Sequence, residues 1–454
     1  MSALNIVSIE KFEILPSNQP ANNTYSFKQG NPIITWNIGS TNKMLRASSL
    51  RINGKIRIKA SNGDMAGNNS INKSRGNGGA ATTGAITCNS RLGVNGVFQN
   101  VNISSNDTNQ TLESVRQYGR MLATVLPSTH SPEDFLNNRG VVELNTGMNA
   151  VSANLNNNTT SFSSSLKVGM FNGGNSIPMG INGVRGLTIS IELVSDQQFL
   201  TGASASAGAF YELCDLSITG DYMVPDSKGM AELSVAGSGA FQYNSFNNMY
   251  SVIDASDSTQ TYNLASSNVL DIFHNFLPVS HANNYSEDSY STGLPKNTNA
   301  GGSTYTSDVL VNKVGFSRGG MKLALDYDLD VTAQSANSRP QTGVLVNALN
   351  SVLPFSQMRK LTNQPQLEGF GGNDQEIYNS SGLQLVSSVD AGVKNFAIGI
   401  AVDNVSKVGI DFRGQAYASR IQSNLDGKSP NSVYTYILNK NTLMYSPQGI
   451  SIVS

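Results

Sequence analysis

The sequence predicts an all-β chain built from two large antiparallel sandwiches, with few short helices and long polar loops. Three observations support this prediction. Apolar and polar residues alternate with a period of two in several segments, as in half-buried strands. Only 13% of the 454 residues are charged, whereas 43 are glycine, and this excludes a coiled coil or long-helix protein, which needs charged exposed faces. Clusters of turn-forming residues separate the alternating segments.

Two segments show the alternation most clearly. Residues 49–59 place leucine and isoleucine side chains on one face and arginine and lysine on the other, with Gly54 marking a bulge or turn. Residues 321–331 place Met321 and the following apolar residues on one face and polar residues on the other. The other expected strands are apolar-rich segments between turns, at residues 33–38, 187–194, 211–219, 230–235, 383–389, 396–402, 408–412, 433–438 and 449–453.

Two helices are expected because their apolar residues recur every three or four positions. The first spans residues 111–125 and the second spans residues 267–277. Pro127 and Pro278 are expected to end them, because proline lacks an N–H group and crowds the preceding turn. Residues 131–134 predict a further short turn of helix with proline at its first position.

The two expected helices share their final sequence pattern. Each is followed by Leu-Pro and, three residues after the proline, by a histidine, His130 in one case and His281 in the other. The same offset aligns polar residues further upstream. Two explanations are open. The match is a coincidence, or the chain arose by internal duplication and each β unit carries a helix at the same point. Under duplication, the two histidines are equivalent structural positions.

The charge balance limits the choice of partners. The chain has 30 basic and 31 acidic residues, and residues 1–19 contain Lys11 as their single base. A basic arm that would wrap nucleic acid is therefore not expected, whereas a neutral surface permits self-association. We expect cytosolic synthesis, with no signal peptide and no membrane span, because the chain has no charged leader with an apolar core and no apolar run of about 18 residues.

Candidate chemical sites are few, and we expect no catalytic, cofactor or metal site. The histidines His130, His274 and His281 form no His-Glu-x-x-His pair, and no Gly-x-Ser-x-Gly motif follows a strand. Cys88 and Cys214 are too few for a disulfide framework or a cysteine zinc site and are interpreted as small, largely buried thiols.

Three other patterns have alternative interpretations. Asp326, Asp328 and Asp330 resemble the start of a calcium loop, but Val331 and Asn337 replace its glycine and glutamate, so a polar strand face is preferred. Residues 369–374 are glycine-rich but fit no phosphate-binding motif and indicate a loop tip. One basic cluster indicates either a solvated strand face or a contact with an acidic partner, a neighbouring subunit or nucleic acid; it comprises Lys43, Arg46, Arg51, Lys55, Arg57 and Lys59.

Two segments resemble a known protein family. Residues 30–58, from Gly30-Asn-Pro-Ile-Ile-Thr-Trp to Gly-Lys-Ile-Arg-Ile58, resemble the opening of major capsid proteins from virophages and polinton-like viruses. Residues 210–225, Phe-Tyr-Glu-Leu-Cys-Asp-Leu-Ser-Ile-Thr-Gly-Asp-Tyr-Met-Val-Pro, resemble the strand that closes their first jelly roll. The resemblance implies a double jelly roll, with two eight-stranded sandwiches in one chain, and trimers that form pseudo-hexagonal capsomers.

This resemblance and the residue patterns lead to the same expected organisation. Residues 1–29 are expected to form an N-terminal arm, residues 30–224 the first jelly roll and residues 225–454 the second, because Pro225 limits continued strand pairing. Three copies would place six sandwiches around a threefold axis in an almost obligate trimer. The resemblance also implies penton and minor capsid proteins as partners and the virion as the location.

A carbohydrate-binding or adhesive β sandwich, such as a fibre or lectin, is the alternative. Such a protein would need an aromatic platform, and Trp36, the single tryptophan, lies in a strand-like segment. A glycosidase is a third class, and it would need two carboxylates facing each other across a cleft. The leading hypothesis from the sequence is a structural capsid protein without catalytic activity.

Overall fold

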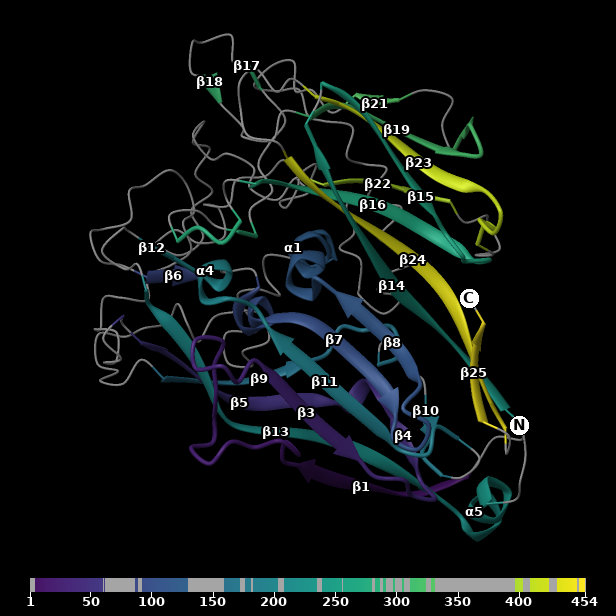
Figure 1. Cartoon of the computed structure of the whole chain (residues 1–454). Helices are drawn as coiled ribbons and strands as arrows, with labels where there is room; N and C mark the ends of the chain where they lie inside the picture. Colours follow the sequence, from purple (N-terminus) through teal and green to yellow (C-terminus); the bar gives the residue numbers. More distant parts are fainter. Residues whose placement is uncertain are drawn as a thin grey trace, which may run out of the picture.

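The computed structural model of the chain forms two antiparallel sandwiches that lie one above the other (Figure 1). The structure describes residues 5–59, 61, 86–88, 92–129, 159–171, 176–180, 183–202, 208–234, 239–254, 256–279, 282–285, 289–290, 297–298, 304–305, 311–323, 328–330, 397–402, 409–423, 431–446 and 449–453.

The first sandwich consists of a seven-stranded and a four-stranded sheet. The seven-stranded sheet has the order β10-β4-β13-β5-β9, and β1 and β2 also pair with β13. The four-stranded sheet has the order β3-β11-β7-β8. Their bounds are β1 Ile6–Ile14, β2 Thr24–Tyr25, β3 Ile33–Ile38, β4 Met44–Arg46, β5 Arg51–Lys59, β7 Phe98–Ser105, β8 Thr111–Arg116, β9 Thr159–Ser165, β10 Ser176–Pro178, β11 Leu187–Leu193 and β13 Phe210–Pro225. A separate pair joins β6 Ile86–Cys88 to β12 Leu200–Gly202.

The second sandwich consists of two five-stranded sheets. One has the order β14-β24-β16-β22 with β25 also on β24, and the other has the order β15-β23-β19-β20 with β21 also on β19. Their bounds are β14 Gly239–Ile253, β15 Asp257–Asn263, β16 Val269–Pro278, β19 Val311–Arg318, β20 Met321–Lys322, β21 Leu329–Asp330, β22 Ala397–Ala401, β23 Ala416–Ser423, β24 Asn431–Ser446 and β25 Gly449–Val453. A separate pair joins β17 Asn297–Thr298 to β18 Thr304–Tyr305.

The predicted alternation appears as alternating burial in the first sandwich. In β3, Ile34, Trp36 and Ile38 are fully buried, whereas Ile33 is 51% exposed. In β5, the isoleucines are buried and Lys55 between them is exposed. Burying one such apolar side chain contributes roughly 1.5–3 kcal/mol, which is why the register of these strands is strongly defined.

The irregularity predicted at Gly54 is a β-bulge, and its extra residue lies in the partner strand. The pairing of β5 with β13 shifts between Cys214 and Ser217, where Asp215 has a φ of 52°. A side-chain carbon on Gly54 would lie 2.4 Å from the end of the Leu216 side chain, so a larger residue here would require Leu216 to move.

Three α-helices and two short 3₁₀ helices are present among the described residues. They are α1 Tyr118–Thr129, α4 Asp196–Phe199, α5 Ser227–Ser234, η1 Ala47–Ser49 and η2 Gly93–Val97. Helix α1 lies between the two sandwiches (Figure 1). Its side chains Tyr118, Met121, Leu122 and Val125 are at most 1% exposed.

The structure corrects the first of the two helices predicted in the sequence. Residues 111–116 form strand β8, and α1 begins only at Tyr118. Gln117 separates the two elements with a positive φ of 52°, a conformation that neither a strand nor a right-handed helix continues. The helix runs to Thr129, so it ends two residues after Pro127 rather than before it.

The second predicted helix is wrong, because residues 269–278 form strand β16. Every residue from Val269 to Leu277 is at most 2% exposed. A strand buried on both faces has no polar face, so its apolar residues do not alternate and can imitate the spacing of a helix. The shared Leu-Pro pattern therefore falls on a helix in one unit and on a strand in the other, and these segments are not equivalent positions of a duplicated unit.

Three other predicted strands differ from the structure. A strand was predicted over 408–412, but within the described residues 409–412 only Ile410 pairs, in an isolated bridge to Val269. Residues 227–234 form helix α5, where a strand was predicted over 230–235; the Asp226 carboxylate accepts a hydrogen bond from Gly229 N at 2.7 Å and begins the helix. Residues 321–331 contain two short strands, β20 and β21, that both pair with β19. Met321 is 68% exposed rather than part of an apolar face.

Strand pairing changes partners near Pro225. Every strand of the first two sheets ends at or before Pro225, and every strand of the last two begins at or after Gly239. Residues 6–14, within the predicted N-terminal arm, form β1 and pair with β13.

Candidate functional site at the junction of the two sandwiches

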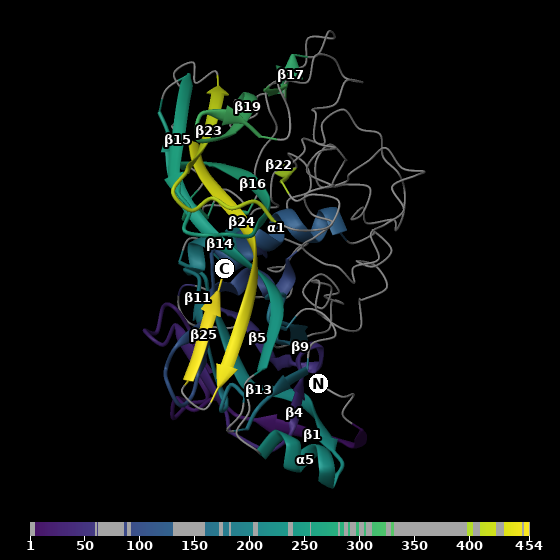
Figure 2. The same cartoon turned by 90° about the vertical axis from the view of Figure 1, so that its right-hand side faces the viewer.

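The apolar core of the first sandwich extends across the junction onto the second sandwich, which also has a separate core cluster of its own. A cluster of buried residues joins Leu122 of α1 to Phe246 of β14, Phe273 of β16 and Tyr436 of β24. The rings of Phe273 and Tyr436 are stacked with centroids 5.0 Å apart. Strands β14 and β24 are long enough to serve the upper sandwich and then continue beside the lower one (Figures 1 and 2). The shared core makes one rigid unit of the two sandwiches.

Hydrogen bonds reinforce this junction where α1 meets β16 and β24. Asn275 Nδ2 donates to Arg120 O at 3.2 Å and to Thr124 Oγ1 at 3.0 Å. The Tyr436 hydroxyl donates to Gln117 O at 3.2 Å. If the two sandwiches were apart, water would hydrate the Asn275 amide. When they pack together, the amide loses that water and needs protein partners, so these hydrogen bonds fix how the sandwiches are oriented.

Arg120 is a buried cation at the same junction, with 2% of its surface exposed. It donates a hydrogen bond to Ser289 O, and its guanidinium lies 4.6 Å from the ring centroid of Tyr434 and 5.8 Å from that of Tyr290. The two aromatic faces provide partial compensation for the loss of water around the charge.

Glu113 of β8 is a buried carboxylate close to the second sandwich. Its Oε1 accepts a hydrogen bond from Gly169 N at 2.9 Å, and its Oε2 accepts one from Met170 N at 2.7 Å. Burial raises the pKa of the Glu113 carboxyl to about 7, although the two N–H donors act in the opposite direction. A side-chain carbon on Gly169 would lie 1.3 Å from Asn244 O of β14, so only glycine fits here.

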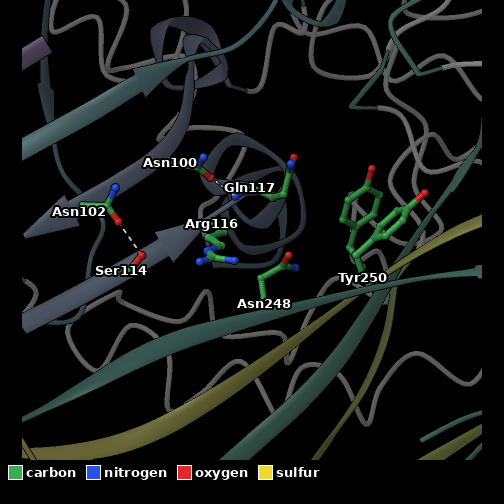
Figure 3. Close-up of a pocket in the computed structure, with 8 residues that line it drawn as sticks. Asn100, Asn102, Ser114, Arg116, Gln117, Asn248 and Tyr250 are labelled. Carbon is green, nitrogen blue, oxygen red and sulfur yellow. Dashed lines mark hydrogen bonds between the residues drawn. The ribbon is translucent and has the colours of Figure 1, made fainter. Parts of the chain in front are cut away.

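A pocket of about 530 Å³ opens beside these contacts (Figure 3). Side chains from both sandwiches face it, and its lining consists of Asn100, Asn102, Ser114, Arg116, Gln117, Asn248, Tyr250 and Tyr434. The first sandwich contributes the outward face of β7 and β8 and the turn before α1. The second contributes β14 and β24.

Hydrogen bonds hold the floor of the pocket in place. Ser114 Oγ donates to Asn102 Oδ1 at 2.5 Å, and Gln117 N donates to Asn100 Oδ1 at 3.2 Å (Figure 3). Asn100 Nδ2 donates to Glu192 Oε2 at 2.6 Å. The positive φ of Gln117 is the conformation that turns the chain from β8 into α1, at the edge of the pocket.

Of the three histidines, the structure describes only His274. His274 lies inside the second sandwich, where its Nδ1 is 2.9 Å from Thr435 Oγ1 and its Nε2 is 2.9 Å from the Tyr417 hydroxyl. Burial lowers the pKa of His274 to about 3, so the ring is neutral at pH 7. His130 and His281 lie outside the described residues.

Four of the six residues of the predicted basic cluster pair with acidic residues of the same chain. Lys55 Nζ lies 2.9 Å from Asp215 Oδ2, and Lys59 Nζ lies 3.1 Å from Glu212 Oε2. Two basic side chains of β5 therefore pair with two acidic side chains of β13. The hydrogen bond from Lys55 lowers the pKa of Asp215. The remaining contacts of the cluster are Lys43 with Glu10, Arg46 with Asp221 at 4.0 Å, and Arg51 with Ser163 Oγ at 2.8 Å. Charge pairing within the chain therefore accounts for Lys43, Arg46, Lys55 and Lys59 without an external acidic partner.

The other sequence candidates remain separate from the junction. Asp328 pairs with Lys322 at 3.0 Å, whereas Asp326 and residues 369–374 lie outside the described residues. Cys214 is a buried free thiol. Trp36 is 0% exposed, so it offers no aromatic platform at the surface.

The described ranges contain neither a cluster of metal-binding side chains nor a membrane-spanning helix. No three histidine, cysteine or acidic side chains there are grouped so that they could hold a metal ion. No helix in the same ranges is both long and apolar enough to cross a lipid bilayer.

Solved structures similar to this chain come from viral capsids. A chain of the PBCV-1 virus capsid has a TM-score of 0.59 and 13% identity, with 100% of this chain and 98% of that chain covered. The Sputnik virophage structure gives 0.54 and 9%, with 100% and 89% covered. The mavirus major capsid protein gives 0.50 and 9%, with 97% and 89% covered. No protein-family profile and no curated protein sequence matches the chain.

The architecture therefore defines an all-β protein of the double jelly-roll class. More narrowly, this chain has the fold of the major capsid proteins of PBCV-1, the Sputnik virophage and mavirus, and the fold implied by the resemblance in the sequence is confirmed.

The sequence did not indicate the junction itself. Arg120, Glu113 and Asn275 carry no motif, and each lies in or next to a segment for which helix was predicted. One feature of the sequence could have indicated these residues: each is a charged or amide residue within an apolar segment. Such a residue is expected to be buried and therefore to need a hydrogen-bond partner from elsewhere in the fold. No residue next to Tyr250 or Tyr434 in the sequence indicates that the two tyrosines line a pocket.

Proposed function

We propose that this chain is a structural capsid protein whose copies associate into the shell of a virus particle. The observation that carries the proposal is the whole-chain match to capsid structures: the PBCV-1 capsid chain is covered over 98% of its length as well as 100% of this chain. Both sandwiches and their relative placement are therefore shared, rather than one common β unit.

The rigid junction supports a building-block role. Tiling a surface requires that every copy present the same shape, and the shared core and the buried hydrogen bonds of α1 fix the angle between the two sandwiches. We further propose that the chain divides near Pro225 into two jelly rolls, with residues 1–29 as an N-terminal arm. Three copies then form a trimer with six sandwiches and a pseudo-hexagonal outline.

The outer edge of β1 supports association between copies. Among the described strands, β1 pairs with β13 alone, and its Val7 and Ile9 side chains are 67% and 56% exposed. An open strand edge with exposed apolar side chains tends to pair with another chain. Penton and minor capsid proteins are the proposed further partners, the virion is the proposed location, and the role is proposed to be structural rather than catalytic.

Light scattering after size-exclusion chromatography, combined with negative-stain microscopy, tests this proposal. The expected result is a species of three times the 48.3 kDa chain mass, or larger shells, with hexagonal outlines in projection. A well-folded, monodisperse monomer at micromolar concentration would overturn the trimer. A stable ring of another symmetry would overturn the pseudo-hexagonal capsomer while leaving self-association in place.

A further inference from the structure

The pocket between the sandwiches is lined by polar and aromatic side chains. All eight side chains carry a hydrogen-bonding group, and none is aliphatic or acidic. Its volume of about 530 Å³ falls within the roughly 300–1,000 Å³ of typical small-ligand sites. None of the described lining residues is aliphatic, so the apolar contacts come chiefly from the two tyrosine rings. This lining suits a ligand that carries many hydroxyl groups.

The free hydrogen-bonding capacity of this lining is mostly that of donors. The Asn102 oxygen is occupied by Ser114, which leaves the Asn102 amide N–H groups for a ligand. Asn248 Nδ2 is a buried atom without a hydrogen-bond partner among the described residues. Because this atom has almost no exposed surface, a ligand oxygen reaches it only when the Asn248 side chain turns toward the pocket, and pairing it then removes a cost of about 1–3 kcal/mol.

Arg116 adds a positive charge to the same space. Its side chain is exposed at the end of β8, and no ion pair joins it to a described acidic residue. The nearest lining residues are neutral, so its planar guanidinium is available for a carboxylate in a two-pronged hydrogen bond.

Two tyrosine rings complete the site. The ring centroids of Tyr250 and Tyr434 are 5.2 Å apart with planes tilted by 54°, and Tyr250 is 54% exposed (Figure 3). Arg120 lies over the Tyr434 ring and holds it from the interior. An exposed ring beside amide donors offers an apolar face to the C–H groups of a sugar and a polar tip to its hydroxyls.

We propose that this pocket binds a carboxylate-bearing saccharide, with Arg116 on the carboxylate, Asn102 and Asn248 on hydroxyl or ring oxygens, and Tyr250 against the sugar face. The proposal does not depend on the capsid role, because every lining residue belongs to one chain. An acidic peptide is the competing occupant, but the described lining contains no aliphatic residue and this favours the saccharide.

Ligand-observed NMR titration of the full-length protein tests the proposal, with N-acetylneuraminic and glucuronic acids, neutral galactose, inorganic sulfate and a capped diglutamate peptide as separate probes. We expect at least one acidic sugar to bind about tenfold more tightly than galactose. We also expect raised salt to weaken the acidic sugar but not the neutral one. Equal affinity for acidic and neutral sugars overturns the proposal, as does tighter binding of the peptide or of sulfate alone.

Three substitutions localise the binding. Arg116→Gln is expected to weaken the acidic sugar about tenfold and galactose less than twofold, because it removes the charge and retains hydrogen bonding. Tyr250→Ala is expected to weaken both sugars. Arg413→Gln is the matched control, because Arg413 is 63% exposed and pairs with Asp411 away from the pocket. Unchanged binding in Arg116→Gln, or equal loss in the control, overturns the assignment.

Discussion

Strands β5 and β16 are both internal strands of their sheets, yet they differ in what covers them. Strand β5 pairs with β13 and β9, buries its isoleucines and leaves Lys55 exposed on the other face. Strand β16 pairs with β24 and β22 and is covered on both faces. Ile272 and Phe276 face the core of their own sandwich, whereas Phe273 and Asn275 face the first sandwich and α1.

This difference shows that one outer face of the second sandwich serves as an inner face of the whole molecule. A single jelly roll would expose Phe273 and Asn275 to solvent. In this chain they are 0% exposed, because α1 and its surroundings cover them. The junction is therefore a third layer of core. A substitution that leaves a cavity there should lower the free energy of unfolding as much as one inside either sandwich.

The largest expected effect comes from removing a ring at the junction. Phe273→Ala is expected to lower the free energy of unfolding by about 3–5 kcal/mol, because the cavity it leaves is enclosed on all sides. Ile33→Ala on β3 is the matched control, since Ile33 is 51% exposed, and it should change stability by less than about 0.5 kcal/mol. Denaturant unfolding measures both, and equal losses would contradict the third layer of core.

A smaller effect is expected where the two backbones approach most closely. Gly169→Ala should cost about 1–3 kcal/mol, because the added carbon would overlap Asn244 O and force β14 away from the first sandwich. Gly39→Ala is the control, because nothing lies within 4 Å of the added carbon there. Thermal unfolding of the two variants gives the comparison. A Gly169→Ala protein as stable as Gly39→Ala would show that the junction is loosely packed.

The pH dependence of stability should distinguish the junction from the exposed sheet faces. The pKa of Glu113 is raised from 4.5 to about 7, so the folded state favours the neutral acid. Its contribution to stability is fully present below about pH 4.5 and is lost as the pH rises through 7.

The stability difference between wild type and Glu113→Gln isolates this contribution. We expect that difference to fall between about pH 4.5 and 7.5 and then to level off. Glu13→Gln, on the exposed face of β1, is the control and should run parallel to the wild type. A rising difference over the same range would mean that the N–H groups of Gly169 and Met170 outweigh burial.

The smallest expected effect concerns the charged face of β5. Lys55→Ala removes the contact with Asp215, but both side chains are 46% exposed and solvent screens their interaction. We expect a slight loss of thermal stability at low salt that disappears at high salt. A large, salt-independent loss would mean that this face is covered in the assembled protein, as in the alternative interpretation of the basic cluster.

Local sequence was sufficient for some strands that have one face toward solvent, but β7, β14 and β23 were not predicted. The alternation of residues 49–59 predicted β5 to within two residues, and the apolar-rich segments 33–38, 187–194 and 449–453 predicted β3, β11 and β25 to within one residue. The resemblance of residues 30–58 and 210–225 also identified the fold class. Composition alone was enough to exclude long helices, because too few charged residues are available to cover them.

The tertiary structure decided everything that depends on a distant partner. Strand β16 was predicted as a helix because burial on both faces removed the period of two. Lys55 is charge-paired because Asp215, 160 positions away in sequence, lies 2.9 Å away in space. The junction and its pocket combine β8 with β14 and β24, and no local pattern encodes which apolar surfaces will meet. Alternation requires solvent on one side, and only the docking of the two sandwiches determined where solvent is excluded.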